Sequence, residues 1–216
     1  MCAARGPAAG AAGRTDAAPR PGQGRRPAAL VRGEVLAAAR ELLLTDGMAA
    51  FTVERVARRS GASRMTIHKW WPSRGALALD AYVAVVDERL AFEDTGDIEA
   101  DLTAHMRKFV RHLCGTSAGR VVAELIGCAQ TDPHLAALFR ERYSGPRRAR
   151  MAAVLERARE RGQLAAEIDS QALIDQLWGA CYFRLLVADN PLTEGFAEVI
   201  VRNLLHGAGG HVTDPA

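Results

Sequence analysis

The sequence predicts an all-α fold, and three observations support this prediction. Apolar residues recur three and four positions apart through almost the whole chain after residue 28, which is the spacing of one helix face. Ser or Thr precedes several of these segments, and Gly or Pro follows them, as is typical of helix boundaries. No segment alternates with a period of two in the manner of a strand.

The first 27 residues differ from the rest because they are mainly Ala, Gly, Pro and Arg, with almost no large side chain. A segment that buries so little cannot offset the entropy of becoming ordered, so we expect a disordered basic tail. Two interpretations of its basic end stay open: a passive tail, or an arm that lies against nucleic acid.

Four helices are predicted next. The first begins near residue 28, because Val31, Val35, Ala38 and Leu42 have helical spacing, and it ends at Gly47.

The other three each begin at a capping residue. Thr52 precedes the second helix, which ends at Gly61, and Ser63 precedes the third. A fourth helix follows Ser73 and reaches about residue 93, before the break "DTGD".

Six further helical patterns follow this break. They are separated by the segments "CGTS", "TDPH", "YSGP", "RGQLAAEI" and "DNPLT". The predicted helices span about 98–114, 117–130, 133–143, 145–161, 169–188 and 193–206.

The composition is that of a folded globular protein, with 216 residues, 49% hydrophobic and 25% charged. No stretch has the apolar length needed to span a membrane, and we expect a cytoplasmic protein. The four cysteines are far apart, without metal-ligand spacing, so we expect free thiols in a reducing compartment. His105 and His112 share a helix face but lack a third ligand. We therefore expect no metal and no cofactor.

Charge is unevenly distributed along the chain. Residues 1–80 carry 13 Lys and Arg against 6 Asp and Glu, a net charge of +7, whereas the remainder has a net charge of −4. A basic first third indicates an anionic partner at that end of the molecule.

The residues from Thr52 to Trp71 have the pattern of a helix-turn-helix. Ala57 is small enough for two helices to cross closely, and Gly61 suits a left-handed turn. Ile67 and Trp71 are four residues apart, so they share one face of the second helix and should pack in the core.

Polar and basic side chains, together with the apolar Met65, occupy the remaining faces of that second helix: Arg64, Met65, Thr66, His68 and Lys69. Such side chains can reach base edges and phosphates in DNA. On the pattern alone, the alternative is an ordinary helical hairpin with a solvated basic face.

The flanking sequence resembles the TetR family of bacterial transcription regulators. The resemblance runs through "ARELLLTDGMAAFTVERVARRSGASRMTIHKWWPSRGALALDAY", residues 38–82. It extends to the ligand-binding region of one subgroup, through "VVAELIGCAQTDPHLAALFRERYSGPRRARMAAVLERARERGQL" and "YFRLLVADNPLTEGFAEVIV". It implies a tail at 1–27, a helix-turn-helix domain at 28–74, a connecting helix at 75–97, a ligand-binding and dimerisation domain at 98–208, and a final tail at 209–216.

The resemblance also implies which residues contact DNA. The capping residues and the basic residues near the fourth helix match phosphate-contacting positions, and the start of the third helix matches base-reading positions. The implied DNA-binding residues are Thr52, Ser63, Arg64, Met65, Thr66, His68, Lys69, Trp70 and Arg74. His68 departs from the usual Tyr. Gly75 also departs from the family pattern, and we expect the fourth helix to start loosely there.

The last two predicted helices are apolar on more than one stripe and must be covered on more than one side. Burial within one chain and a four-helix dimer interface are both compatible with this pattern, and the resemblance favours the homodimer. The interface residues that we expect are Trp178, Tyr182, Leu185, Phe196, Ile200 and Leu204.

The middle helices would enclose a ligand pocket in proteins that this chain resembles. The candidate lining residues are Met106, Phe109, Leu113, Leu125, Cys128, Phe139, Tyr143 and Trp178. Ordinary core packing is the alternative for each of them. Since we recognise no charged cluster in this region, we expect an apolar or weakly polar effector.

These observations predict a DNA-binding transcriptional regulator. We expect a repressor that binds a palindromic operator as a homodimer and is released by a small molecule. The alternatives are a protein-interaction adaptor with a vestigial helix-turn-helix, an activator, and a regulator without a ligand. No constellation of catalytic residues is recognisable, so an enzyme is not expected.

Overall fold

The computed structural model describes residues 27–187 and 189–207. The predicted tails at 1–27 and 209–216 therefore lie outside the described residues, apart from Pro27, which precedes the first helix.

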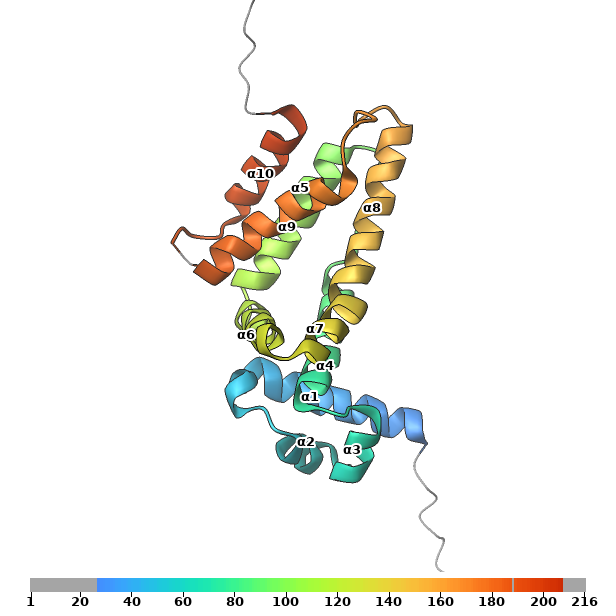
Figure 1. The fold of residues 1–216 in the computed structure, drawn as a ribbon, viewed down its shortest axis with the longest axis vertical. Coiled ribbons are helices and arrows are strands. Elements are labelled where there is room, and N and C mark those ends of the chain that lie inside the picture. Colours follow the sequence, from blue (N-terminus) through green and yellow to red (C-terminus); the bar gives the residue numbers. More distant parts are fainter. Residues whose placement is uncertain (1–26, 188, 208–216) are drawn as a thin grey trace, which may run out of the picture.

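Over these described residues the chain forms helices and no strands, which confirms the predicted all-α class. Figure 1 shows α1, α2 and α3 gathered at one end of the molecule, with α4 leading from them toward the remaining helices. The elements are α1 (Ala28–Ala50), α2 (Val53–Ser60), α3 (Arg64–Trp70), α4 (Arg74–Arg89), α5 (Ile98–Cys114), α6 (Ala118–Thr131), α7 (Pro133–Phe139), the π-helical segment η1 (Arg140–Ser144), α8 (Gly145–Glu160), α9 (Ser170–Val187) and α10 (Glu194–His206).

The first three helices and the start of α4 share a core of fully buried side chains. Val35, Val56, Ile67 and Trp71 have no exposed surface. The expected burial of Ile67 and Trp71 is therefore confirmed, although Trp71 is the residue that follows α3 and has an extended backbone.

The predicted starts of the second and third helices and the end of the second are also confirmed, whereas the first helix, predicted to end at Gly47, continues to Ala50 across a kink at Gly47, where φ is 74°. Thr52 Oγ1 accepts a hydrogen bond from the Arg55 backbone N–H at 3.2 Å, and Ser63 Oγ accepts one from Thr66 N–H at 3.1 Å. Gly61 follows α2 with φ of 69°, a left-handed conformation that glycine adopts without steric cost.

The structure corrects the two ends predicted for α4. The helix ends at Arg89 instead of near residue 93, because the chain turns at Leu90, which is buried. At its start, Ser73 Oγ accepts a hydrogen bond from Ala76 N–H at 3.1 Å. The expectation of a loose start at Gly75 is therefore wrong. A Cβ at Gly75 would lie 3.0 Å from Leu135 Cδ2, so glycine lets α7 approach α4 closely.

The predicted break at "YSGP" is wrong as well. The chain remains helical from α7 through η1 into α8, and Gly145 N–H donates to Arg140 O across a wide π turn. Pro146 has no N–H, and in an ordinary α-helix its ring would clash with the carbonyl four residues earlier. The wide π turn stands immediately before this proline, at the point where an ordinary α-helix would be interrupted.

The second part of the molecule is built from α5 to α10. α5 lies against both α9 and α10, and α8 lies along α9 on the side away from α10 (Figure 1). Among the described residues, no helix is both long enough and apolar enough to span a membrane.

Candidate DNA-binding helix and internal cavity

The seven residues of α3 divide into a buried side and an exposed side. Ile67 is fully buried, whereas Met65 is 85% exposed. Arg64, His68 and Lys69 are also exposed. The helix is thus held by its apolar back and offers a polar and basic front to a partner.

The basic residues of this front are exposed to solvent, and one of them takes part in a weak ion pair. Arg64 Nη1 lies 3.3 Å from Glu54 Oε1, and both side chains are more than half exposed. The pKa of the Glu54 carboxyl is lowered, first by a hydrogen bond to its own backbone and then by one to Arg64. Because exposed pairs of this kind contribute little to stability, a base or phosphate can take Arg64 from Glu54 at small cost.

The two capping hydroxyls lie at the starts of α2 and α3. Each uses its oxygen as an acceptor for a backbone N–H, which leaves the hydroxyl hydrogen to donate. Ser63 Oγ is also 2.9 Å from Thr66 Oγ1. Both capping residues, Thr52 and Ser63, are positioned at helix N-termini, where anions are favoured.

Trp70 lies at the end of α3, on a groove between α3 and the start of α1. The two Trp rings meet edge to face, with centroids 5.7 Å apart and an angle of 79°. The groove has a volume of about 580 Å³ and is lined by Pro27, Ala28, Val31, Gly61, Ala62, Ser63, Thr66, Lys69 and Trp70. Trp70 thus faces the start of α1 at the edge of the domain. Arg74 is exposed at the beginning of α4.

Asp80 of α4 connects this domain to the second part of the molecule, and sequence analysis missed it. The indole N–H of Trp71 donates to Asp80 Oδ2 at 2.8 Å. Arg142 of η1 donates to Asp80 Oδ1 at 2.8 Å. Arg32 of α1 lies 3.5 Å from the same carboxylate, with its guanidinium 5.2 Å from the centre of the Trp71 ring. One carboxylate thus links α1, the end of α3, α4 and η1.

The residues expected to line a ligand pocket belong to one core. Six of them are buried: Met106, Phe109, Leu113, Leu125, Tyr143 and Trp178. The other two, Cys128 and Phe139, are partly buried against the same core. Trp178 alone among the eight also lines the internal cavity.

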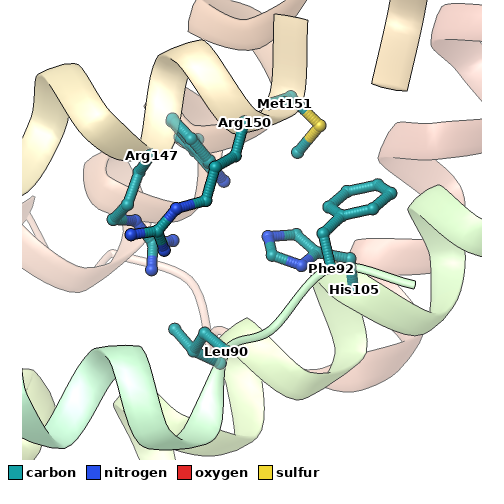
Figure 2. Close-up of a pocket in the computed structure, with 7 residues that line it drawn as sticks. Leu90, Phe92, His105, Arg147, Arg150 and Met151 are labelled. Atoms are coloured by element: carbon teal, nitrogen blue, oxygen red, sulfur yellow. The ribbon is translucent and has the colours of Figure 1, made fainter. Parts of the chain in front are cut away.

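That cavity lies between α8, the end of α4 and α5. Figure 2 shows Arg147 and Arg150 extending from one side toward the cavity, with His105 and Phe92 on the other side and Leu90 below. Met151 and Trp178 complete the lining. Its volume is about 10 Å³, room for one water molecule.

Arg147 is the residue of this region that sequence analysis missed. It is 7% exposed, and its guanidinium carbon lies 5.2, 5.3 and 5.0 Å from the ring centres of Phe109, Tyr143 and Trp178. The sequence analysis recognised no charged cluster in this region, and the structure adds one buried cation, the guanidinium of Arg147, to it. The signal was present in the sequence, because Arg147 stands between Tyr143 and Met151 on a stripe that is otherwise apolar.

The two histidines of α5 do not share one site. His105 lines the cavity, and burial followed by the charge of Arg147 lowers its pKa to about 3. His112 lies against Tyr82, with ring centres 6.2 Å apart, and burial lowers its pKa to about 4. Both imidazoles are therefore neutral at pH 7. In the part of the chain that the structure describes, no group of three metal-binding side chains occurs.

The residues expected at a dimer interface are largely turned inward in the protomer. Trp178 and Ile200 are buried, and Tyr182, Leu185, Phe196 and Leu204 are partly buried. Tyr182 donates to or accepts from Tyr143, with the two hydroxyl oxygens 2.8 Å apart. The large apolar side chains that α9 and α10 expose are Phe183, Leu186, Val187 and Val199.

Comparison with known proteins places this geometry in a family. Residues 35–81 match the model described as bacterial regulatory proteins of the tetR family, and residues 92–204 match a tetracyclin repressor-like C-terminal domain. The HTH-type transcriptional regulator YdeS of Bacillus subtilis is 34% identical over 173 residues, which cover 80% of this chain and 87% of YdeS.

Two further relatives extend the comparison. The DNA-binding transcriptional repressor TetR of Mycobacteroides abscessus is 29% identical over 184 residues, covering 82% of this chain and 95% of that protein. The crystal structure of the TetR family transcription regulator SCO0332 is similar to this fold with a TM-score of 0.78. It has 53% sequence identity and covers 83% of this chain and 99% of that chain.

Proposed function

Because this chain belongs to the TetR family of helix-turn-helix DNA-binding transcriptional regulators, we propose that it is a repressor released from DNA by a small molecule. In this proposal it binds a palindromic operator as a homodimer, in the cytoplasm. A relative of 29% identity is named as a repressor, which supports this direction of control.

The observation that carries the proposal is the division of α3 into two sides. A buried Ile67 fixes the helix, while Arg64 and Met65 at its start and Lys69 near its end are exposed. In helix-turn-helix proteins the first residues of the second helix contact base edges in the major groove. We assign base reading to Arg64, Met65 and Thr66, and phosphate contacts to the remaining predicted residues: Thr52, Ser63, His68, Lys69, Trp70 and Arg74.

A single α3 reads only one half-site, so the proposal requires two copies of the chain. Phe183, Leu186, Val187 and Val199 are exposed apolar residues of α9 and α10 and would be covered by a second copy. Two half-sites bound in this way are about 34–36 Å apart or a multiple of that distance.

Control by a ligand would act through α4. The end of this helix contributes Leu90 to the cavity, and its middle carries Asp80, which holds the indole of Trp71. A ligand that displaces Leu90 would shift α4 and, with it, the recognition helix of each protomer. Release follows if the shifted state no longer fits both half-sites.

Selection of bound duplexes from a random DNA library tests the proposal, followed by titration at two salt concentrations. We expect a palindrome bound by a dimer, with affinity for it exceeding that for random DNA at both salt concentrations. Weak binding that is equal for all sequences and is lost in salt would contradict the proposal and favour an adaptor.

A further inference from the structure

Three polar side chains with unpaired nitrogen atoms meet at the internal cavity. Arg147 Nη2, Trp178 Nε1 and both ring nitrogens of His105 are buried without a hydrogen-bond partner. All three residues line the same cavity. Buried polar groups of proteins are nearly always hydrogen-bonded, so a cluster of unpaired nitrogens in one cavity indicates a site for a polar ligand.

The charge of this cluster is positive. No carboxylate among the described side chains is paired with Arg147, and the lining contains Arg150 and no acidic residue. The nearby acids are engaged elsewhere: Asp87 pairs with Arg150 at 3.0 Å, and Asp94 pairs with Arg157 and Arg161. The guanidinium therefore lacks the anion that a buried cation ordinarily requires.

The surroundings of the guanidinium define the rest of the ligand. The rings of Phe109, Tyr143 and Trp178 surround Arg147, and Leu90, Phe92 and Met151 form apolar walls. A guanidinium binds a carboxylate with two parallel N–H bonds. Apolar walls around one cation suit a monoanion with a hydrocarbon or aromatic body better than a polyanion, whose further charges would be buried without partners.

We propose that the cavity at Arg147 binds the carboxylate of a small organic acid. Arg147 and the Trp178 indole N–H donate to the carboxylate oxygens, and neutral His105 presents its N–H at the same place. The cavity holds one water-sized group as it stands, so the body of the acid separates α8 from the segment containing Leu90 and Phe92. Since Leu90 ends α4, binding acts on the helix that leads to the DNA-binding domain. This last step rests on the proposed function; acid binding itself does not.

Calorimetric titration of the full chain without DNA tests the proposal, with a parallel measurement of the melting temperature. The probes are sodium formate, benzoate and 3-phenylpropionate, each compared with its neutral amide and with sodium chloride at equal ionic strength. We expect at least one acid to bind at least tenfold more tightly than its amide and to raise the melting temperature. If no acid binds better than its amide, the proposal is overturned.

Three variants locate the site. Arg147→Met keeps an unbranched stem but removes the charge, and it should abolish the preference for acid over amide. Arg148→Met is the matched control, because Arg148 is the next residue of α8, pairs with Asp175 and does not line the cavity, so this variant should keep that preference. If circular dichroism shows that Arg147→Met does not fold, Arg147→Lys replaces it and should weaken acid binding several-fold. A preference that persists undiminished in the folded Arg147 variant would overturn the proposal.

The operator affinity is measured separately, with and without the acid that binds. An acid that binds through Arg147 without changing operator affinity would support the anion site and contradict the proposed release mechanism. Failure to select any operator would contradict the proposed function while leaving the calorimetric result valid.

Discussion

The DNA-binding domain and the cavity region use charge in opposite ways. At α3 the charged side chains are in water, and the Arg64–Glu54 pair is more than half exposed on both sides. At the cavity, Arg147 is buried among aromatic rings without a carboxylate among the described side chains. Exposed charges cost little and exchange partners easily, whereas a buried cation is costly unless it is paired. The first arrangement suits an extended polyanion, and the second suits one small anion.

The largest effect we expect concerns the core of the DNA-binding domain. Trp71→Ala removes a fully buried indole and its bond to Asp80, so it should lower the free energy of unfolding by about 3–5 kcal/mol. Chemical denaturation measures this loss. Trp70→Ala is the matched control and should cost much less, because Trp70 is only partly buried. Equal losses for the two variants would show that the two Trp side chains do not have distinct roles.

Acidification should destabilise the cavity region. The pKa of His105 is lowered to about 3 by burial and by the charges of Arg147 and Lys108. The unfolded chain takes up a proton below about pH 6.5, whereas the folded chain does not until about pH 3. The contribution of neutral His105 to the free energy of unfolding is therefore fully present above pH 6.5, and it falls by about 1.4 kcal/mol per pH unit below that.

Denaturation at pH 7, 6 and 5 measures this slope, and His105→Phe should reduce it. His112, whose pKa is lowered to about 4 by burial and by Arg89 and Arg147, contributes in the same direction. Exposed His134 supplies the control, since His134→Phe should leave the slope unchanged. If the slope in His105→Phe equals that of the unchanged protein, the burial of a neutral imidazole at this position would be contradicted.

Arg64 and Lys69 of α3 should differ in how they affect DNA binding. Arg64→Ala should weaken the free energy of binding to the selected operator by about 1–3 kcal/mol and relax the sequence preference at one base pair. Lys69→Ala should weaken binding to all sequences alike and reduce the salt dependence. Titration of both variants against operator and random duplexes separates the two effects. Equal losses of Arg64→Ala on both duplexes would remove Arg64 from base reading.

The smallest effect concerns the turn between α2 and α3. Gly61 has φ of 69°, and a Cβ there meets no neighbouring atom within 4 Å. Gly61→Ala should therefore lower the free energy of unfolding by only about 1 kcal/mol, because alanine is disfavoured at this positive φ but meets no steric clash. Thermal unfolding measures it. Gly127→Ala is the control, because Gly127 lies within α6, has no positive φ and has equal space, so this change should be neutral or stabilising.

The features that the sequence could predict differ from those it could not in how far apart the interacting residues lie in the chain. Helix periods, the caps Thr52 and Ser63 and the buried pair of α3 depend on neighbours within a few residues, so the sequence pattern predicted them correctly. Asp80, which joins Trp71 to Arg142, depends on residues 62 positions apart. The apolar neighbours Tyr143 and Met151 gave a local signal for the burial of Arg147, but its contacts with the rings of Phe109 and Trp178 depend on α5 and α9, which are distant in the sequence. Long-range packing therefore decided these two features, whereas the missed continuity of the helix at "YSGP" depends on a local π turn.

The central claim is that α3 reads DNA sequence. The most direct measurement is the ratio of affinities for the selected operator and for a random duplex of equal length, determined at two salt concentrations. We expect a ratio of about 10³ or more, in the range of specific DNA-binding proteins, that persists at the higher salt concentration. A ratio near one, with binding that disappears in salt, would contradict the claim.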